Sequence, residues 1–330
     1  MRLGLRRGCW RWPTGRAVAT GLLAVVAIGC GPVDELEPDG ERSVTPIAAA
    51  ASGASGFVVD DVGDTLRTEA PRTRVVSMIP SVTELLIALG RTDRLVGRTR
   101  YDTDQLLSAL PSVGGGLDPD MESLVALRPD LVVLWPDHDM RGVGARLQEL
   151  GVPTYGARIE GLADFRRHAA AIGDLINLRS AADSLVHALD EDLARVRAAV
   201  SGRDRPTVAY VISLNPPMVA GPGTFVDSLI AVAGGRNAFP DLTAPWPQIS
   251  LEEVVRRDPD YVAFSVADQD ALALVRTAVG WERVAAVREE RLAAFDPDRF
   301  NRPGPGIADA AAELARWLHP DAFEPLRRQR

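Results

Sequence analysis

A helix–turn–strand pattern occurs twice in this chain, 130 residues apart, and it limits what the chain can fold into. The first copy runs from Glu122 to Trp135 and the second from Glu252 to Phe264. Each copy has a short amphipathic helix, a Pro-Asp turn and an apolar run of strand length. Upstream of each copy, residues 81–90 and 223–235 match as an apolar helix with a small-residue start and a glycine stop. The duplication predicts two α/β lobes of similar build with a cleft between them.

The first 30 residues differ in character from the rest of the chain. Five arginines precede an apolar run from Ala17 to Gly29, which ends at Cys30. This run has 13 residues, whereas a membrane-spanning helix needs about 20, so residues 1–30 are predicted to be a secretory signal. The residues before Cys30 resemble the lipobox of bacterial lipoproteins, which implies that signal cleavage leaves this cysteine as a lipidated N-terminus. Cleavage to a free soluble protein is the alternative.

Loss of this signal makes the mature chain strongly acidic. Removing five arginines and no acidic residue takes the formal net charge from -8 to -13. This charge argues against nucleic acid as a partner and against electrostatic adhesion to anionic lipid, so we expect membrane contact only through a lipid anchor. The two cysteines are Cys9 and Cys30, which leaves the mature domain without a disulfide or a cysteine metal site. No metal site and no cofactor are predicted.

Composition and periodicity divide the rest of the chain into five segments. Residues 31–56 are rich in Gly, Pro, Ser and Ala, without periodicity, which predicts a flexible tether. Alternating strand and helix patterns predict α/β lobes with mostly parallel sheets, the first opening with a hairpin that turns at Val62-Gly63. The segments after the tether are an N-terminal α/β lobe at 57–160, a helical connector at 161–203, a C-terminal α/β lobe at 204–320 and a tail at 321–330.

The connector pattern is interrupted once. Apolar residues at helical spacing run from Leu162 to Val200, with a break at 177–180. Ser180 and Asp183 fit the start of a second helix as a capping pair. We therefore expect two packing helices that together form a stiff link between the lobes.

Five motifs in the second half of the chain carry a resemblance to a known family. They are Asn215-Pro-Pro-Met218, Gly221-Pro-Gly-Thr-Phe225, Ala233-Gly-Gly-Arg-Asn237, Pro245-Trp-Pro-Gln-Ile-Ser250 and Arg299-Phe-Asn-Arg-Pro-Gly-Pro305. From about Val58 to Leu318 the chain resembles periplasmic substrate-binding proteins of ABC importers, in the vitamin B12 and iron-siderophore class, with vitamin B12 (cobalamin) binders the nearer. The resemblance implies the class III fold, in which two Rossmann-like lobes are joined by a long helical connector and open only slightly. It also implies a monomer in the periplasm or cell envelope, anchored to the membrane as a lipoprotein.

The resemblance further implies that Glu122 and Glu252 dock into arginine pockets of a permease dimer, which works with its ATPase subunits. Each glutamate is the second residue of its predicted helix, after the N-caps Asp120 and Ser250. A helix dipole favours a carboxylate there by about 0.3–1 kcal/mol, so a purely local role is the alternative. Ser250 and Glu253 form a capping box, which leaves Glu252 free to point outward.

The resemblance also implies a ligand cleft in which aromatic residues cover a flat corrin ring and a few polar groups fix its position. The matching positions are Tyr101, Trp135, Met218, Phe225, Trp246, Asp298, Phe300 and Arg302. A buried packing role for Trp246 is equally open. The sequence departs from the family twice, because no aromatic-proline pair follows Tyr101 and because glycines occupy 114–116, near where a cleft tryptophan can occur.

Other chemistry finds little support in the sequence. There is no HExxH, Walker loop, GxSxG or CxxC motif, and the four histidines lack zinc-ligand spacing. His168 and His187 are expected to face solvent from the connector helices. His138 follows a predicted strand end, where it could reach the cleft, but an ordinary loop position is the favoured interpretation. Residues 221–223 are predicted to form a tight glycine turn in preference to an anion site.

These observations favour a non-enzymatic receptor that captures a corrinoid in the cleft between its lobes and delivers it to an ABC permease. A ferric siderophore or haem is the alternative ligand, with Arg98, Arg100, Arg299 and Arg302 as candidate contacts. An exported enzyme that acts on a small cleft-bound metabolite is the alternative from another class. A sensor or scavenger without a permease is a third possibility.

Overall fold

A computed structural model describes residues 56–265 and 270–323, which belong to one compact unit that starts at Gly53. The predicted signal, Cys30 and nearly all of the tether lie outside the described residues, as does the tail from residue 324 onward. Within the described ranges, every helix is too short or too polar to cross a membrane.

The described chain opens with the hairpin that the sequence predicts. Strand β1 (Phe57–Val59) pairs antiparallel with β2 (Thr65–Arg67), and Gly63 takes a positive φ in the turn. The Asp60 carboxylate accepts hydrogen bonds from the backbone of the turn and, at 2.8 Å, from the Gly156 N–H. This last contact ties the hairpin to the first lobe.

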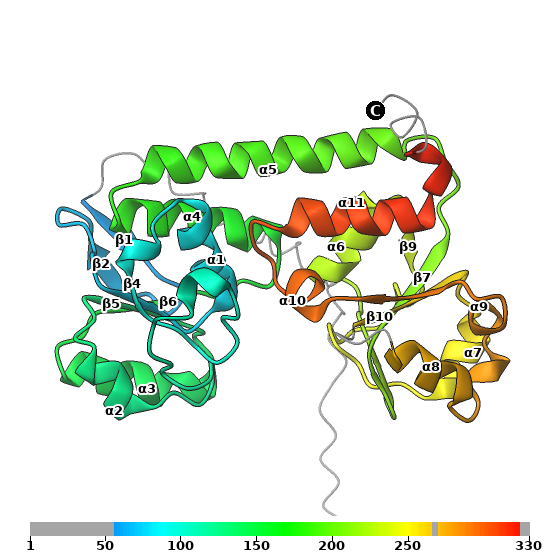
Figure 1. Cartoon of the computed structure of the whole chain (residues 1–330), viewed down its shortest axis with the longest axis horizontal. Coiled ribbons are helices and arrows are strands. Elements are labelled where there is room, and N and C mark those ends of the chain that lie inside the picture. Colours follow the sequence, from blue (N-terminus) through cyan, green and yellow to red (C-terminus); the bar gives the residue numbers. More distant parts are fainter. Residues whose placement is uncertain (1–55, 266–269, 324–330) are drawn as a thin grey trace, which may run out of the picture. The chain divides into compact units, whose positions relative to one another are not determined.

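The first lobe, at the left in Figure 1, is built on a parallel sheet. This sheet has four strands in the order β4-β3-β5-β6. All four residues of β5 are buried, as expected for a strand in the interior of a parallel sheet. The strands are β3 (Val75–Ser77), β4 (Leu95–Gly97), β5 (Leu131–Leu134) and β6 (Thr154–Gly156). The helices are α1 (Pro80–Ala88), α2 (Met121–Ala126) and α3 (His138–Glu149), with short 3-10 turns η1 (Thr92–Arg94) and η2 (Gln105–Leu107).

The second lobe has a five-stranded mixed sheet. Its main path is β11-β10-β7-β8, and β9 also pairs with β7. All pairings are parallel except that of β7 with β8. The strands are β7 (Thr207–Leu214), β8 (Pro217–Val219), β9 (Arg236–Asn237), β10 (Tyr261–Ser265) and β11 (Leu292–Phe295). The helices are α6 (Phe225–Val232), α7 (Leu251–Arg257), α8 (Asp270–Thr277), α9 (Ala285–Arg288), α10 (Pro297–Phe300) and α11 (Ile307–Leu318), with turns η3 (Trp281–Arg283) and η4 (Pro320–Ala322).

Two helices connect the lobes. Helix α4 (Leu162–Leu175) and the longer α5 (Arg179–Ala199) are separated by a turn in which Asn177 has a φ of 58°. Helix α5 packs against α4 at one end and α11 at the other (Figure 1). The predicted capping pair is wrong, because α5 begins at Arg179 and the Asp183 carboxylate accepts hydrogen bonds from the Arg179 side chain instead. The predicted fold class, two α/β lobes joined by a helical connector, is confirmed.

The repeated Pro-Asp turn forms the same hydrogen bonds in both lobes. The aspartate after each repeated proline receives hydrogen bonds from a threonine at the start of that lobe's first parallel strand. Asp130 accepts from the Thr73 N–H at 2.8 Å and Oγ1 at 2.9 Å, and Asp260 accepts from the Thr207 N–H at 2.7 Å and Oγ1 at 2.8 Å. These bonds to the backbone lower the pKa of Asp260 despite its partial burial. The repeat therefore joins the two central strands of each sheet at their amino ends.

Candidate ligand-binding cleft

A pocket of about 520 Å³ lies between the lobes, and we call it the cleft pocket. Its volume is within the range of about 300–1,000 Å³ that is usual for small-molecule sites. The first lobe contributes residues 78–81, Gly116, Leu117, Trp135, Ile159 and Glu160. The second lobe contributes residues 223–225, Pro245, Trp246 and residues 301–303.

Topology places this pocket where parallel sheets usually bind ligands. Met78 directly follows β3, and Trp135 directly follows β5, so both stand at the carboxyl edge of the first sheet. Trp246 approaches from the other lobe. Both tryptophans are partly exposed and pack against the hydrophobic core with the rest of their surface. Each indole can therefore present an apolar face to a ligand while the core holds it in place.

Close backbone packing positions the loop that carries Trp246. The Gly221 N–H donates to the Pro245 carbonyl at 2.8 Å. A Cβ atom at Gly221 would lie 2.3 Å from the carbonyl oxygen of Ala244, so only glycine fits there. The glycine at this position is thus explained by a close approach of two backbone segments that form one wall of the cleft pocket.

The predicted tight turn at 221–223 is confirmed. Gly223 has a φ of 77°, and its N–H donates to the Asp227 carboxylate at 3.0 Å. Thr224 caps helix α6 by accepting a hydrogen bond from the Asp227 N–H. The turn already holds a carboxylate of the protein, which makes it a poor site for a ligand anion.

Of the eight predicted ligand residues, the structure brings four together. Trp135, Phe225, Trp246 and Arg302 all line the cleft pocket. Phe225, the first residue of α6, is almost wholly buried, so it forms part of the floor.

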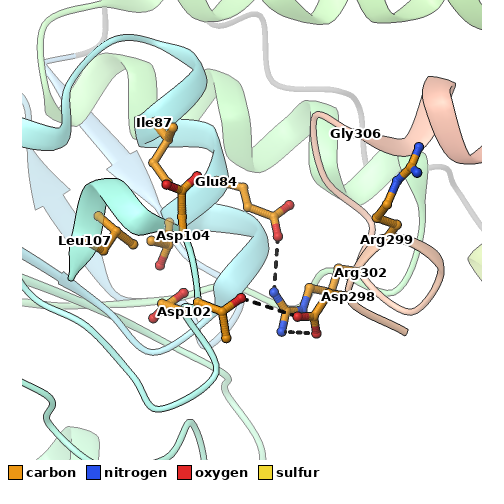
Figure 2. A pocket seen from close by; sticks show the side chains of 11 residues that line it. Glu84, Ile87, Asp102, Asp104, Leu107, Asp298, Arg299, Arg302 and Gly306 are labelled. Carbon is orange, nitrogen blue, oxygen red and sulfur yellow. Dashed lines mark hydrogen bonds and ion pairs between the residues drawn. The ribbon is translucent and has the colours of Figure 1, made fainter. Parts of the chain in front are cut away.

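The other four lie outside this pocket. Phe300 is fully buried and packs against Phe295 with ring centroids 4.4 Å apart, so its side chain belongs to the core. Met218 lies in β8, where it bridges to Gln248. The Tyr101 side chain is half exposed, and its carbonyl accepts a hydrogen bond from Arg302. Asp298 lines a neighbouring pocket, described below (Figure 2).

The structure adds cleft residues that sequence reasoning missed. Leu117 is 61% exposed although it is large and apolar, and it follows the glycines at 114–116. The sequence feature that could have identified Leu117 as a cleft residue is an isolated leucine after a run of glycines. Ile159 and Glu160 follow β6, so their position at a strand end could have marked them as well.

Charge is sparse in the cleft pocket. Arg302 and Glu160 are the charged residues in its described lining. The other candidate arginines have partners elsewhere. Arg98 donates to the Thr99 carbonyl, Arg100 pairs with Asp118 at 2.7 Å, and Arg299 pairs with Glu313 at 2.9 Å. The arginine cluster expected of a receptor for a polyanionic chelate is therefore not formed in this part of the structure.

The prediction for His168 is wrong. Its ring is fully buried, and it lies between the Tyr155 hydroxyl and the Asp61 carboxylate, each at 2.9 Å. His187 is exposed, as predicted. The prediction for His138 is wrong, because it is the first residue of α3 and not a loop residue; its side chain lies outside the described residues. Among the residues that the structure describes, no three His, Cys, Asp or Glu side chains are grouped so that they could hold a metal ion.

Glu122 and Glu252 occupy equivalent places on the two lobes. Each is exposed at the second position of its helix, after the N-cap Asp120 or Ser250. Neither carboxylate has a hydrogen bond or ion pair with another described residue. The capping box is half formed, because Ser250 accepts from the Glu253 N–H while the Glu253 carboxylate binds arginines of its own helix.

The positions of these two glutamates follow from the topology. Helices α2 and α7 each lead into a parallel strand and run antiparallel to it, so their amino ends lie at the carboxyl edges of the sheets. The cleft opens at the same edges. One exposed carboxylate thus stands at the carboxyl-edge side of the sheet in each lobe.

Comparison with known proteins identifies the family. A family model described as periplasmic binding protein matches residues 75–299. The chain belongs to the periplasmic binding protein family. Substrate-binding proteins of ABC transporters, which this family includes, bind small ligands and work with permease and ATPase components.

Named relatives of this periplasmic binding protein differ in ligand. A cobalamin-binding protein of Halobacterium salinarum is 30% identical over 317 residues, covering 90% of this chain and 84% of the relative. An ABC transporter substrate-binding lipoprotein of Bacillus subtilis, YvrC, is 27% identical over 311 residues, covering 92% and 96%. The crystal structure of a periplasmic heme-binding protein from Pseudomonas aeruginosa matches with a TM-score of 0.67 and 27% identity, covering 76% and 93%. The matches extend over both lobes.

Proposed function

We propose that this protein is the solute-binding component of an ABC importer and that it captures a corrinoid in the cleft pocket. The observation that supports this proposal most directly is the composition of that pocket. Two tryptophans from opposite lobes, with Phe225 and Leu117, provide apolar faces suited to a flat macrocycle. A cobalamin-binding relative supports the same ligand class.

The polar groups of the pocket favour a corrinoid over haem or a ferric siderophore. A polyanionic ligand needs several free cations, and the described lining of the cleft pocket supplies only Arg302, which is already paired. The Ser81 hydroxyl can exchange hydrogen bonds with an uncharged carboxamide, whereas Thr224 and Asn301 already form hydrogen bonds within the protein. No cofactor is proposed for the protein itself, because the bound corrinoid is cargo.

Delivery is proposed to depend on Glu122 and Glu252. Their equivalent placement suits a two-fold permease surface that carries cationic pockets. The double variant E122A/E252A should lose corrinoid uptake in cells and keep the ligand affinity of the purified protein. The matched control E191A/D192A removes two exposed carboxylates from α5 and should transport normally. Uptake by E122A/E252A at the level of this control would exclude the docking role.

Anchoring is proposed to occur through Cys30. The lipoprotein relative from Bacillus subtilis and the apolar run before Cys30 support this assignment. The variant C30S should shift the protein from the membrane fraction to the soluble fraction of the cell envelope, as a monomer. An unchanged membrane fraction for C30S would contradict the lipid anchor.

A further inference from the structure

A second, smaller pocket adjoins the cleft pocket and shares Arg302 with it. This side pocket has a volume of about 300 Å³. It is enclosed by α1, by the loop around η2 and by the segment from α10 to the start of α11 (Figure 2). Because Arg302 lines both spaces, the two pockets meet at this residue.

Arg302 donates hydrogen bonds to acceptors in both lobes. Its guanidinium donates to the Glu84 carboxylate at 3.3 Å and to the Tyr101 carbonyl at 3.0 Å, both in the first lobe. In its own lobe it donates to the Asp298 carboxylate at 2.6 Å. Figure 2 shows Glu84 and Asp298 converging on this one guanidinium. Arg302 thus links the two lobes, and the carboxylates of Glu84 and Asp298 already balance its positive charge.

The side pocket carries an excess of negative charge. Four carboxylates and two guanidinium groups line it, and one of the latter, Arg299, pairs with Glu313 outside the lining. Burial raises the pKa of Glu84, and although Arg302 opposes this shift, the nearby carboxylates of Asp102 and Asp298 add to it. A further negative charge is unfavourable here. Carboxylates only accept hydrogen bonds, so the same surroundings attract a neutral group that donates them.

We propose that Glu84, together with Asp298, makes the side pocket a charge filter that admits carboxamide arms of the ligand and rejects carboxylate arms. This inference rests on the proposed corrinoid function and adds the residues that determine specificity. An amide NH2 group offers two donors to these carboxylates, whereas a carboxylate of the same shape faces like charge and offers no donor. The filter explains how one fold can separate a ring with an amide periphery from a ring with a carboxylate periphery.

The test uses two ligands with the same ring and metal. In dicyanocobinamide the ring side chains are carboxamides, and in dicyanocobyrinic acid they are carboxylates. Calorimetric titration of the purified chain at neutral pH and physiological salt should give at least about tenfold tighter binding of cobinamide, because the carboxylates of cobyrinic acid meet like charge in the side pocket. E84Q keeps an acceptor for Arg302 and removes one charge. The ratio of the affinity for cobinamide to the affinity for cobyrinic acid should therefore fall at least about threefold in E84Q.

A matched control separates the pocket from the overall charge. E191Q makes the same chemical change on the exposed surface of α5, and its affinity ratio for the two ligands should equal that of the unmodified protein. D298N removes a second charge from the side pocket and should act in the same direction as E84Q, which covers the case in which E84Q does not fold.

The outcomes distinguish failure of the charge filter from failure of the proposed corrinoid function. Equal affinities for the two corrinoids, or a ratio in E84Q and D298N that matches the ratio in E191Q, would overturn the filter and leave the corrinoid receptor standing. Absence of binding to either corrinoid would overturn both.

Discussion

The buried network of Tyr155, His168 and Asp61 gives a prediction that can be worked out in detail. Burial lowers the pKa of His168, and the positive charge of Arg167 adds to this effect, so the ring is neutral near pH 7. A neutral imidazole has one donor and one acceptor. Because the Asp61 carboxylate can only accept, His168 Nε2 carries the proton and Nδ1 accepts from the Tyr155 hydroxyl.

The variant Y155F removes that donor and leaves Nδ1 buried without a partner. Such a loss costs about 1–3 kcal/mol, which corresponds to a fall in Tm of roughly 2–10 °C for a domain of this size. The control Y261F removes a hydroxyl that has no hydrogen bond to another described residue and should change stability by less than about 0.5 kcal/mol. Thermal unfolding followed by circular dichroism at pH 7.5 measures both. Equal Tm values for the two variants would refute the assigned network.

The same network predicts a pH dependence. The unfolded chain takes up a proton on His168 near the ordinary histidine pKa of about 6.5, while the folded protein resists this until a lower pH. Stability contributed by the neutral ring is therefore present above about pH 6.5 and is lost as the pH falls toward the folded pKa. The free energy of unfolding of H168Q should thus vary less between pH 7 and pH 5 than that of the unmodified protein. Identical slopes would contradict the assigned direction.

Three further predictions follow from single contacts. The Thr83 hydroxyl is buried without a partner among the described residues, so T83V should raise the free energy of unfolding by about 1 kcal/mol in a denaturant titration. G221A should lower it by about 1–3 kcal/mol, because the added Cβ meets the Ala244 carbonyl, and a stability equal to the unmodified protein would contradict the close approach. W246A should weaken corrinoid binding about 10- to 100-fold in calorimetry if the indole covers the ring, and an unchanged Kd would assign Trp246 to packing alone.

Local sequence patterns were sufficient to predict much of the fold. The hairpin that turns at Val62-Gly63 and the two helix–turn–strand copies form where the apolar periods and turn residues predict them. The N-caps Asp120 and Ser250 also form as predicted. These features depend on residues within a few positions of one another, which a single sequence displays directly.

The composition of the site was harder to predict because it depends on contacts between distant segments. Glu84 meets Arg302 across 218 positions of the chain, and no helical or strand period records that pairing. Phe300 belongs to an aromatic pair in the core, which the motif around it does not distinguish from a cleft position. His168 was misplaced for a related reason: the apolar pattern of α4 does not reveal that a hairpin from far upstream covers one of its polar positions.

The measurement that tests the central claim most directly is a calorimetric titration of the purified protein with cyanocobalamin, with haemin and a ferric siderophore titrated in parallel. The account predicts saturable one-to-one binding of cyanocobalamin, accompanied by quenching of tryptophan fluorescence from Trp135 and Trp246. Binding of haemin or the siderophore with no response to cyanocobalamin would contradict the assignment of the cleft pocket to a corrinoid.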